Sequence, residues 1–204
     1  MNIVIHAAFI DALFQIQLQE EINNQNIIDY KNYIKSKEPE GVIRSNDEGW
    51  QLDIPRGVCH EIEKMVCLME DNVTDIFNNV YGFDTKIQLA NMWLNENPRG
   101  GSNAYHTHPG CIFSGVYYIA ATGDPEQGQI CIQRDSHHVY ADLNTRSHKV
   151  EPQGNVDSPE IRTHANFIAQ EGSAYVFPPH FNHMVTKNNT DISRVVMGMN
   201  FQAV

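Results

Sequence analysis

Residues 105–120 read YHTHPGCIFSGVYYIA, in which two histidines one residue apart precede a mostly apolar run. In a β-strand, side chains two residues apart point to the same face. The pattern therefore predicts that His106 and His108 direct their imidazoles to one point. A third histidine, His183, lies in a second strand-like block, and Arg194 follows eleven residues later. Together these residues indicate a metal centre beside a group that binds a carboxylate.

Composition narrows the class of protein. The chain has 204 residues and a formal net charge of −11, so a nucleic-acid backbone is an unfavourable main partner. The four cysteines have no CxxC spacing, which predicts reduced thiols and a cytoplasmic location. The apolar run 3–10 is too short for a membrane span and lacks a basic leader, so we expect no signal peptide and no membrane partner.

The hydrophobic pattern predicts helices first and short strands later. We expect a strand over residues 3–9, a helix over 18–37 that ends at the Pro-Glu-Gly of 39–41, and an amphipathic helix over 60–80. The strands expected after these helices cover residues 87–94, 112–120, 129–133, 167–169, 174–177 and 194–201. Short strands at such intervals favour an antiparallel barrel or jelly roll.

These elements predict a single domain over residues 1–204. Residues 1–86 supply an N-terminal strand and supporting helices, and residues 87–204 supply the β core. The polar segment 134–166 is long for a plain connection, so we expect either a functional lid or a partly mobile region.

The histidines allow more than one interpretation. A single strand histidine is most often an ordinary packed residue, but an HxH pair brings two neutral nitrogen donors together, and imidazole suits iron, zinc, copper and nickel. For the third ligand, His180 competes with His183. The pair Pro178-Pro179 interrupts strand pairing, which predicts a turn before His183.

Arg194 begins an otherwise apolar strand. Its charge either faces solvent or, if it is buried, needs an anionic partner. No nearby aspartate or glutamate is obliged to pair with it, so the carboxylate of a ligand is the attractive partner.

These motifs resemble those of the Fe(II)/2-oxoglutarate-dependent dioxygenases, and most closely a group of oxygenases from marine bacteria and their phages that is related to prolyl 4-hydroxylases. The resemblance covers residues 87–202. In the family, an HxD motif precedes a Tyr-Tyr-Leu-like strand, two glycine-led strands, a distal histidine and an arginine about ten residues later. The corresponding segments here are 106–108, 117–119, 128–132, 172–178, His183 and Arg194.

The resemblance implies a mainly β fold with N-terminal helices, the double-stranded β-helix or jelly roll shared with cupins. It also implies Fe(II) and 2-oxoglutarate as cofactors and a hydroxylase that releases succinate and CO₂. The location would be the cytoplasm, or the host cytoplasm if a phage encodes the chain. Carried over residue by residue, it assigns His106 and His183 to iron and assigns Arg194 and Tyr118 to the distal carboxylate of 2-oxoglutarate. It further assigns Asn91, Trp93 and Asn200 to the cosubstrate pocket.

The sequence departs from the family at one ligand, because His108 stands where the family has aspartate. Either His108 completes a three-histidine centre, which we favour because its position is equivalent, or a carboxylate such as Asp135 supplies the third ligand. Two other functions remain open. One is a cupin-type dioxygenase with three histidines and no 2-oxoglutarate, and the other is a non-catalytic barrel that binds a metal or ligand. The substrate, either a small molecule or a protein side chain, is not specified by the sequence, and neither is the oligomeric state.

Overall fold

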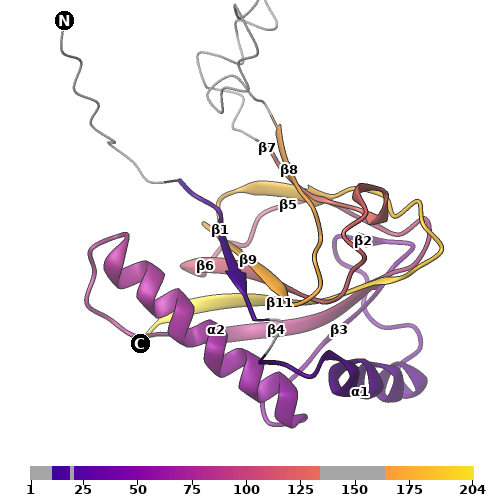
Figure 1. Ribbon diagram of the computed structural model, residues 1–204, viewed down its shortest axis with the longest axis horizontal. Coiled ribbons are helices and arrows are strands. Elements are labelled where there is room, and N and C mark those ends of the chain that lie inside the picture. Colours follow the sequence, from indigo (N-terminus) through magenta and orange to yellow (C-terminus); the bar gives the residue numbers. More distant parts are fainter. Residues whose placement is uncertain (1–10, 19–20, 134–163) are drawn as a thin grey trace, which may run out of the picture.

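The computed structural model describes residues 11–18, 21–133 and 164–204. It contains a six-stranded and a five-stranded antiparallel sheet, with two long helices on one side of the larger sheet (Figure 1). The expected strand at 3–9 lies outside the described residues, as does most of the segment 134–166.

Two antiparallel sheets form the jelly roll that the short strands predict. The larger sheet has the order β1 (Phe14–Gln17), β9 (Ser173–Phe177), β6 (Phe113–Ala120), β11 (Arg194–Ala203), β4 (Ile87–Asn97) and β3 (Trp50–Asp53). The smaller sheet has the order β2 (Asn46–Asp47), β5 (Ser102–His106), β10 (Asn182–Val185), β7 (Ile130–Gln133) and β8 (His164–Phe167). The fold class is therefore confirmed as a double-stranded β-helix with N-terminal helices.

The larger sheet has a different environment on each face, because successive side chains of a strand alternate between the faces. On β11, Met197 and Met199 are fully buried in the cluster that joins this sheet to the helices. Val196 and Gly198 alternate with these methionines along the strand and line a cavity on the opposite, inner face. The outer face thus carries the main core, and the inner face carries the site described below.

Helix α2 (His60–Asn79) covers the outer face and is the amphipathic helix predicted at 60–80. Its fully buried side chains share one stripe and include Ile62, Val66, Met69 and Val73. Burial of a side chain of this size contributes about 1.5–3 kcal/mol relative to an exposed one. This stripe therefore holds the helix against the sheet.

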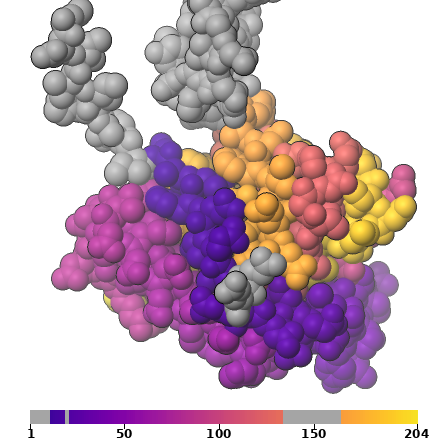
Figure 2. Space-filling model, in the orientation of Figure 1, coloured from indigo at the N-terminus to yellow at the C-terminus, as the bar shows by residue number. Residues whose placement is uncertain are grey.

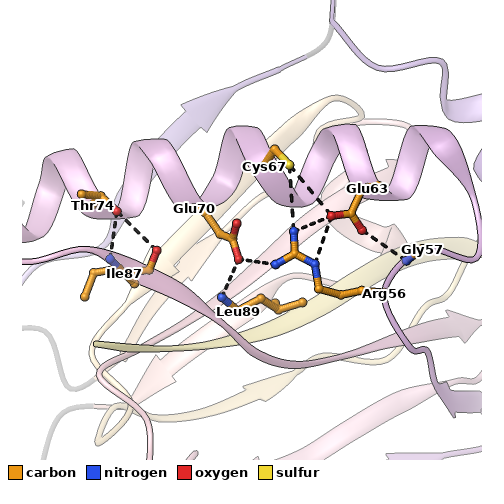
Figure 3. A network of polar contacts seen from close by, with 8 residues as sticks. All are labelled: Arg56, Gly57, Glu63, Cys67, Glu70, Thr74, Ile87 and Leu89. Atoms are coloured by element: carbon orange, nitrogen blue, oxygen red, sulfur yellow. Dashed lines mark hydrogen bonds and ion pairs between the residues drawn. The ribbon is translucent and has the colours of Figure 1, made fainter. Parts of the chain in front are cut away.

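Polar contacts along α2 fix its position relative to β4 (Figure 3). The guanidinium of Arg56 donates to the carboxylates of Glu63 and Glu70, and Glu70 also accepts a 2.8 Å hydrogen bond from the backbone N–H of Leu89 on β4. The hydrogen bond from Arg56 is the main cause that lowers the pKa of Glu63. Thr74 adds a second link, since its hydroxyl accepts a 3.1 Å hydrogen bond from the backbone of Ile87.

Helix α1 spans Asn24–Lys37, so the predicted start at residue 18 was wrong. The apolar residues Leu18 and Ile22 are buried in the core but precede the helix. Residues 14–17 instead form β1, and the N–H of Leu18 continues this pairing with a 2.7 Å hydrogen bond to the oxygen of Gly172. In Figure 2 this indigo segment lies between the magenta helical region and the orange strands.

A buried ion cluster ties α1 to the larger sheet. Glu96 on β4 accepts from Lys31 at 3.0 Å and from Lys35 at 2.8 Å, and the side chain of Lys31 is only 6% exposed. Burial raises the pKa of Glu96, but the hydrogen bonds from the two lysines outweigh it, so the net direction is down. Glu96 is therefore held as a carboxylate beside the lysines.

Among the predicted strands, β8 differs most from its predicted bounds, and several strands were not predicted. Residues 164–167 form β8 against β7, whereas the sequence suggested a strand at 167–169 and placed 164–166 in the lid. Strand β8 lies at the edge of the smaller sheet and contains the polar residues His164 and Asn166, so its sequence lacks the apolar run that predicts a strand. Strands β1, β2 and β3 were missed because each has only two to four residues, which is too short for a clear periodic pattern. All four cysteines are free thiols, as expected. None of the helices in the described residues has the length and apolar character that a membrane span requires.

Candidate metal centre

Three histidines converge on one point between the sheets. His106 on β5 and His183 on β10 are directly paired across the smaller sheet. With His108 they form a cluster in which one nitrogen of each ring lies within 4.8 Å of the others. The Nε2 atoms of His108 and His183 are 3.3 Å apart. Two nitrogens that bind one metal at about 2.0–2.1 Å lie about 3 Å apart, so this spacing fits a shared ion.

Backbone contacts set which nitrogen of each paired ring is available. The Nδ1 atom of His106 lies 2.7 Å from the oxygen of Ala104, and that of His183 lies 2.9 Å from the oxygen of Phe181. A carbonyl only accepts, so each Nδ1 must carry the proton and each Nε2 is left with its lone pair. Metal-binding histidines are typically oriented by such a hydrogen bond on the other ring nitrogen. Both rings thus present Nε2 as a donor atom to the same point.

Burial keeps all three rings neutral. It lowers the pKa of His183 to about 3 and that of His108 to about 4, in both cases with a further contribution from the charge of His106. Burial also lowers the pKa of His106, while its hydrogen bond to Ala104 acts in the opposite direction. Neutral imidazole is the form that binds metals. The donor set therefore suits a divalent transition metal at neutral pH.

The prediction that one strand carries both His106 and His108 was wrong. Strand β5 ends at His106, and His108 lies in the turn that follows. Its backbone N–H donates a 2.9 Å hydrogen bond to the oxygen of Pro179, in the turn that leads to His183. A contact between two turns, and not strand alternation, therefore brings the third ring to the cluster. His180 lies outside the cluster, with an exposed ring 3.4 Å from Asp11, and Asp135 is outside the described residues.

A cavity leads from the histidines to a buried arginine. Its empty space is about 520 Å³, including the part that is open to solvent. The residues that line it include the three histidines, Trp93, Tyr118, Phe177 and Arg194. Arg194 is only 2% exposed, and its Nη1 donates to the oxygen of Gly128 at 3.3 Å. Its Nε is buried without a hydrogen-bond partner, and no carboxylate among the described residues pairs with it. A buried, under-satisfied guanidinium at the wall of a cavity fits a ligand carboxylate.

Tyr118 lies beside Arg194 on the same inner face. Burial raises the pKa of Tyr118 above its usual value, and the charge of Arg194 acts in the opposite direction. Burial likewise lowers the pKa of Arg194. The phenol is therefore a neutral hydrogen-bond donor near the guanidinium, and its role at a ligand carboxylate stays a prediction.

The three other predicted pocket residues divide into two groups. Trp93 lines the cavity, whereas Asn91 and Asn200 do not. These two asparagines are paired across β4 and β11, and the amide of Asn200 donates to Asn91 at 3.0 Å and accepts from Ser114 at 2.8 Å. They lie two paired positions along the strands from Trp93 and Gly198, and their assignment to the cosubstrate pocket is still an untested prediction.

Several polar residues of the cavity were missed by sequence reasoning. Asn95 lines it with Asn103 and Ser45, and the amide of Asn95 donates to Asn103 at 3.3 Å while Asn103 donates to Ser45 at 3.2 Å. Buried asparagines on strands give little sequence signal. Gly198 gave a clearer one, because a glycine inside an apolar strand often marks a close approach of another group.

Comparison with known proteins places this site in a family. A family model described as "Putative 2OG-Fe(II) oxygenase" matches residues 91–200, more than half of the chain. The chain belongs to this family of 2OG-Fe(II) oxygenases. The suspected resemblance is thus confirmed, and Fe(II) and 2-oxoglutarate are the cofactors of the family. No curated protein sequence matches the chain.

Solved structures of 2OG-Fe(II) oxygenases share the fold. A Pseudomonas putida prolyl-4-hydroxylase has a TM-score of 0.64 at 11% identity, covering 94% of this chain and 92% of that one. HygX from Streptomyces hygroscopicus, with nickel and 2-oxoglutarate bound, has a TM-score of 0.61 at 10% identity, with coverages of 94% and 83%. The α-ketoglutarate-dependent epimerase SnoN from nogalamycin biosynthesis has a TM-score of 0.61 at 11% identity, with coverages of 94% and 78%. These similarities establish the fold.

Proposed function

We propose that the chain is an Fe(II)- and 2-oxoglutarate-dependent oxygenase that hydroxylates a C–H bond of a small molecule or a protein side chain. One observation carries the proposal. Three neutral imidazoles meet at one point of a cavity whose wall also holds a buried arginine with an unpaired donor. The metal site would bind the end of 2-oxoglutarate that contacts iron, and the arginine in the same cavity would bind its distal carboxylate.

In this proposal His106, His108 and His183 hold the iron, and Arg194 and Tyr118 bind the distal carboxylate of 2-oxoglutarate. When bound, Fe(II) and 2-oxoglutarate would supply the oxidation with O₂ as oxidant, with one oxygen atom entering the substrate and the other entering succinate as CO₂ is released. Arg194 and Tyr118 orient the cosubstrate, and the apolar side chains of Phe177 and Val196 limit water in the cavity.

Three imidazoles make this centre more positive than the usual set of two histidines and one carboxylate. All three donors here are neutral, so an Fe(II) centre keeps its full positive charge before anionic ligands bind. We therefore propose that the carboxylate of 2-oxoglutarate nearer the iron supplies the negative charge that the aspartate gives in the family pattern.

A cupin-type dioxygenase that does not use 2-oxoglutarate is the second candidate. The observation that favours it is the lack of a carboxylate in the described histidine cluster. In that case Arg194 would bind a carboxylate of the substrate itself. The third reading, a non-catalytic barrel that binds metal, predicts metal binding with no O₂ consumption.

Succinate formation separates these functions. Protein loaded with Fe(II) is supplied with O₂, 2-oxoglutarate and a panel of candidate peptides and metabolites, and succinate and O₂ are measured together. The proposal expects succinate that depends on iron and is lost in an H106A variant. O₂ consumption without succinate would support the cupin-type reaction. Metal binding without either would support the non-catalytic barrel.

A further inference from the structure

His108 is held differently from the other two histidines. His106 and His183 are fixed by strand pairing and by a hydrogen bond from Nδ1 to a backbone carbonyl. His108 lies beyond the end of β5, and within the described part of the chain its only hydrogen-bond contact through the ring is the approach of its Nε2 to His183. Something else must therefore set the plane of this imidazole.

Among the described residues, the rings that pack against His108 are those of His106, His183 and Trp93, and only the indole of Trp93 comes from outside the histidine cluster. The indole and the imidazole of His108 are nearly parallel, with an angle of 13° between their planes and 5.6 Å between their centroids. Offset, near-parallel packing of this kind is a favoured arrangement of aromatic rings. Trp93 is on β4, a strand of the larger sheet, so the contact links the two sheets at the metal cluster.

Gly198 provides the place for the indole. It is the direct partner of Trp93 across β4 and β11. A Cβ at position 198 would lie 2.3 Å from Cε2 of Trp93 and 2.5 Å from both Cζ2 and Nε1. Any side chain there would displace the indole, so only glycine permits this position. The indole of Trp93 therefore contacts both the backbone of Gly198 and the imidazole of His108.

We propose that Trp93 is a positioning residue for the third metal ligand, and that Gly198 sets the depth at which its indole lies. This inference rests on the proposed function, since it takes His108 as a ligand. The indole limits rotation of the imidazole, so that Nε2 stays directed at the point shared with His183. The indole thus orients the ring of His108, as hydrogen bonds to backbone carbonyls orient the rings of His106 and His183.

Cobalt(II) binding tests the proposal without turnover, because Co(II) occupies iron sites and its visible absorption reports on the ligand set. Groups that orient metal ligands are worth about 10- to 100-fold in metal affinity. We expect W93A and G198A to weaken Co(II) binding by about tenfold and to change the visible bands. The conservative variant W93F keeps a ring against His108 and should remain close to the wild type in both measurements.

A double-mutant cycle separates positioning from general support of the fold. If Trp93 acts through His108, W93A should cause no further loss of Co(II) affinity in an H108A background. An equal loss with and without His108, or a W93A protein that binds Co(II) within about threefold of the wild type with the same spectrum, would overturn the inference. Circular dichroism checks folding. Should W93A not fold, W93L, which keeps the bulk but not the ring, replaces it in the cycle.

The outcome also distinguishes this inference from the proposed function. Wild-type protein that binds Co(II) and releases succinate, with Trp93 variants that bind equally well, removes the positioning role alone. Wild-type protein that binds no Co(II) contradicts the metal centre, and with it both proposals.

Discussion

Replacement of Arg194 by methionine tests how the cavity binds a carboxylate. The guanidinium is 2% exposed, has one hydrogen bond to Gly128 and keeps Nε unpaired. Loss of one partner of a buried charge pair costs about 2–5 kcal/mol. A value of about 3 kcal/mol corresponds to roughly a 100-fold loss of 2-oxoglutarate affinity, since 1.4 kcal/mol is a factor of ten. Metal affinity should change little, because Arg194 is not part of the histidine cluster.

Thermal denaturation with Co(II) bound measures this loss directly. At a ligand concentration 100 times the wild-type Kd, 2-oxoglutarate should stabilise the wild type by about 2.7 kcal/mol. At the same concentration, a variant with 100-fold weaker binding should gain only about 0.4 kcal/mol. Without ligand, R194M should be no less stable than the wild type, because it removes a buried charge that has no carboxylate partner among the described residues.

Arg99 offers a matched control for this experiment. Its side chain is 65% exposed and pairs with Asp191 at the surface, so R99M should show the full stabilisation by 2-oxoglutarate. A folded R194M protein that 2-oxoglutarate stabilises as much as it does the wild type would refute the assignment of Arg194 to the cosubstrate.

Three further changes test the site and the fold. Y118F removes one hydroxyl donor to a charged group, so we expect about a tenfold loss of 2-oxoglutarate affinity by calorimetry with Co(II) affinity unchanged; a loss of metal affinity instead would contradict the assignment. H183A should reduce Co(II) affinity by at least about 100-fold, whereas H180A, a neighbouring histidine outside the cluster, should bind as the wild type does. E96Q should lower the free energy of unfolding by about 3 kcal/mol in urea at pH 7, because Lys31 stays buried without a carboxylate. The fold lowers the pKa of Glu96 from 4.5, so its contribution is present above pH 4.5 and is lost as the pH falls through the lowered value. The difference between E96Q and the wild type should therefore shrink below pH 4.5, and a constant difference would be inconsistent with this cluster.

The sequence predicted the elements whose pattern is local. Helix α2 has a continuous apolar stripe, and β6 and β11 are apolar runs, so their existence followed from periodicity. Helix α1 began later than expected because residues 14–17 form a strand that pairs with β9, more than 150 residues away in sequence. Leu18 and Ile22 are therefore buried without being part of the helix. Hydrophobic periodicity alone does not distinguish an apolar residue buried in a helix from one buried in the non-helical segment that precedes it.

The residue types of the candidate site followed from the sequence, but its geometry did not. The HxH spacing singled out both histidines as candidate ligands, but the loop that carries His108 is held by a hydrogen bond to Pro179, which no local pattern encodes. For the same reason the sequence predicted that Trp93 lines the cosubstrate pocket but gave no indication that its indole contacts both Gly198 and His108. Long-range packing, and not residue identity, determines these positions.

Side chains along each strand of the larger sheet alternate between the helices and the cavity, and this alternation determines which mutations the protein can tolerate. Neighbouring residues such as Tyr117 and Tyr118 serve different layers, the first facing the helices and the second the cavity. Insertion or deletion of one residue in β6 or β11 would exchange these layers along the whole strand. Substitutions in the outer row, where Met197 and Met199 meet the helices, leave the inner row in place. Directed evolution of this scaffold can therefore tune thermal stability through the outer row and substrate preference through the inner row, as two independent libraries built on the same strands.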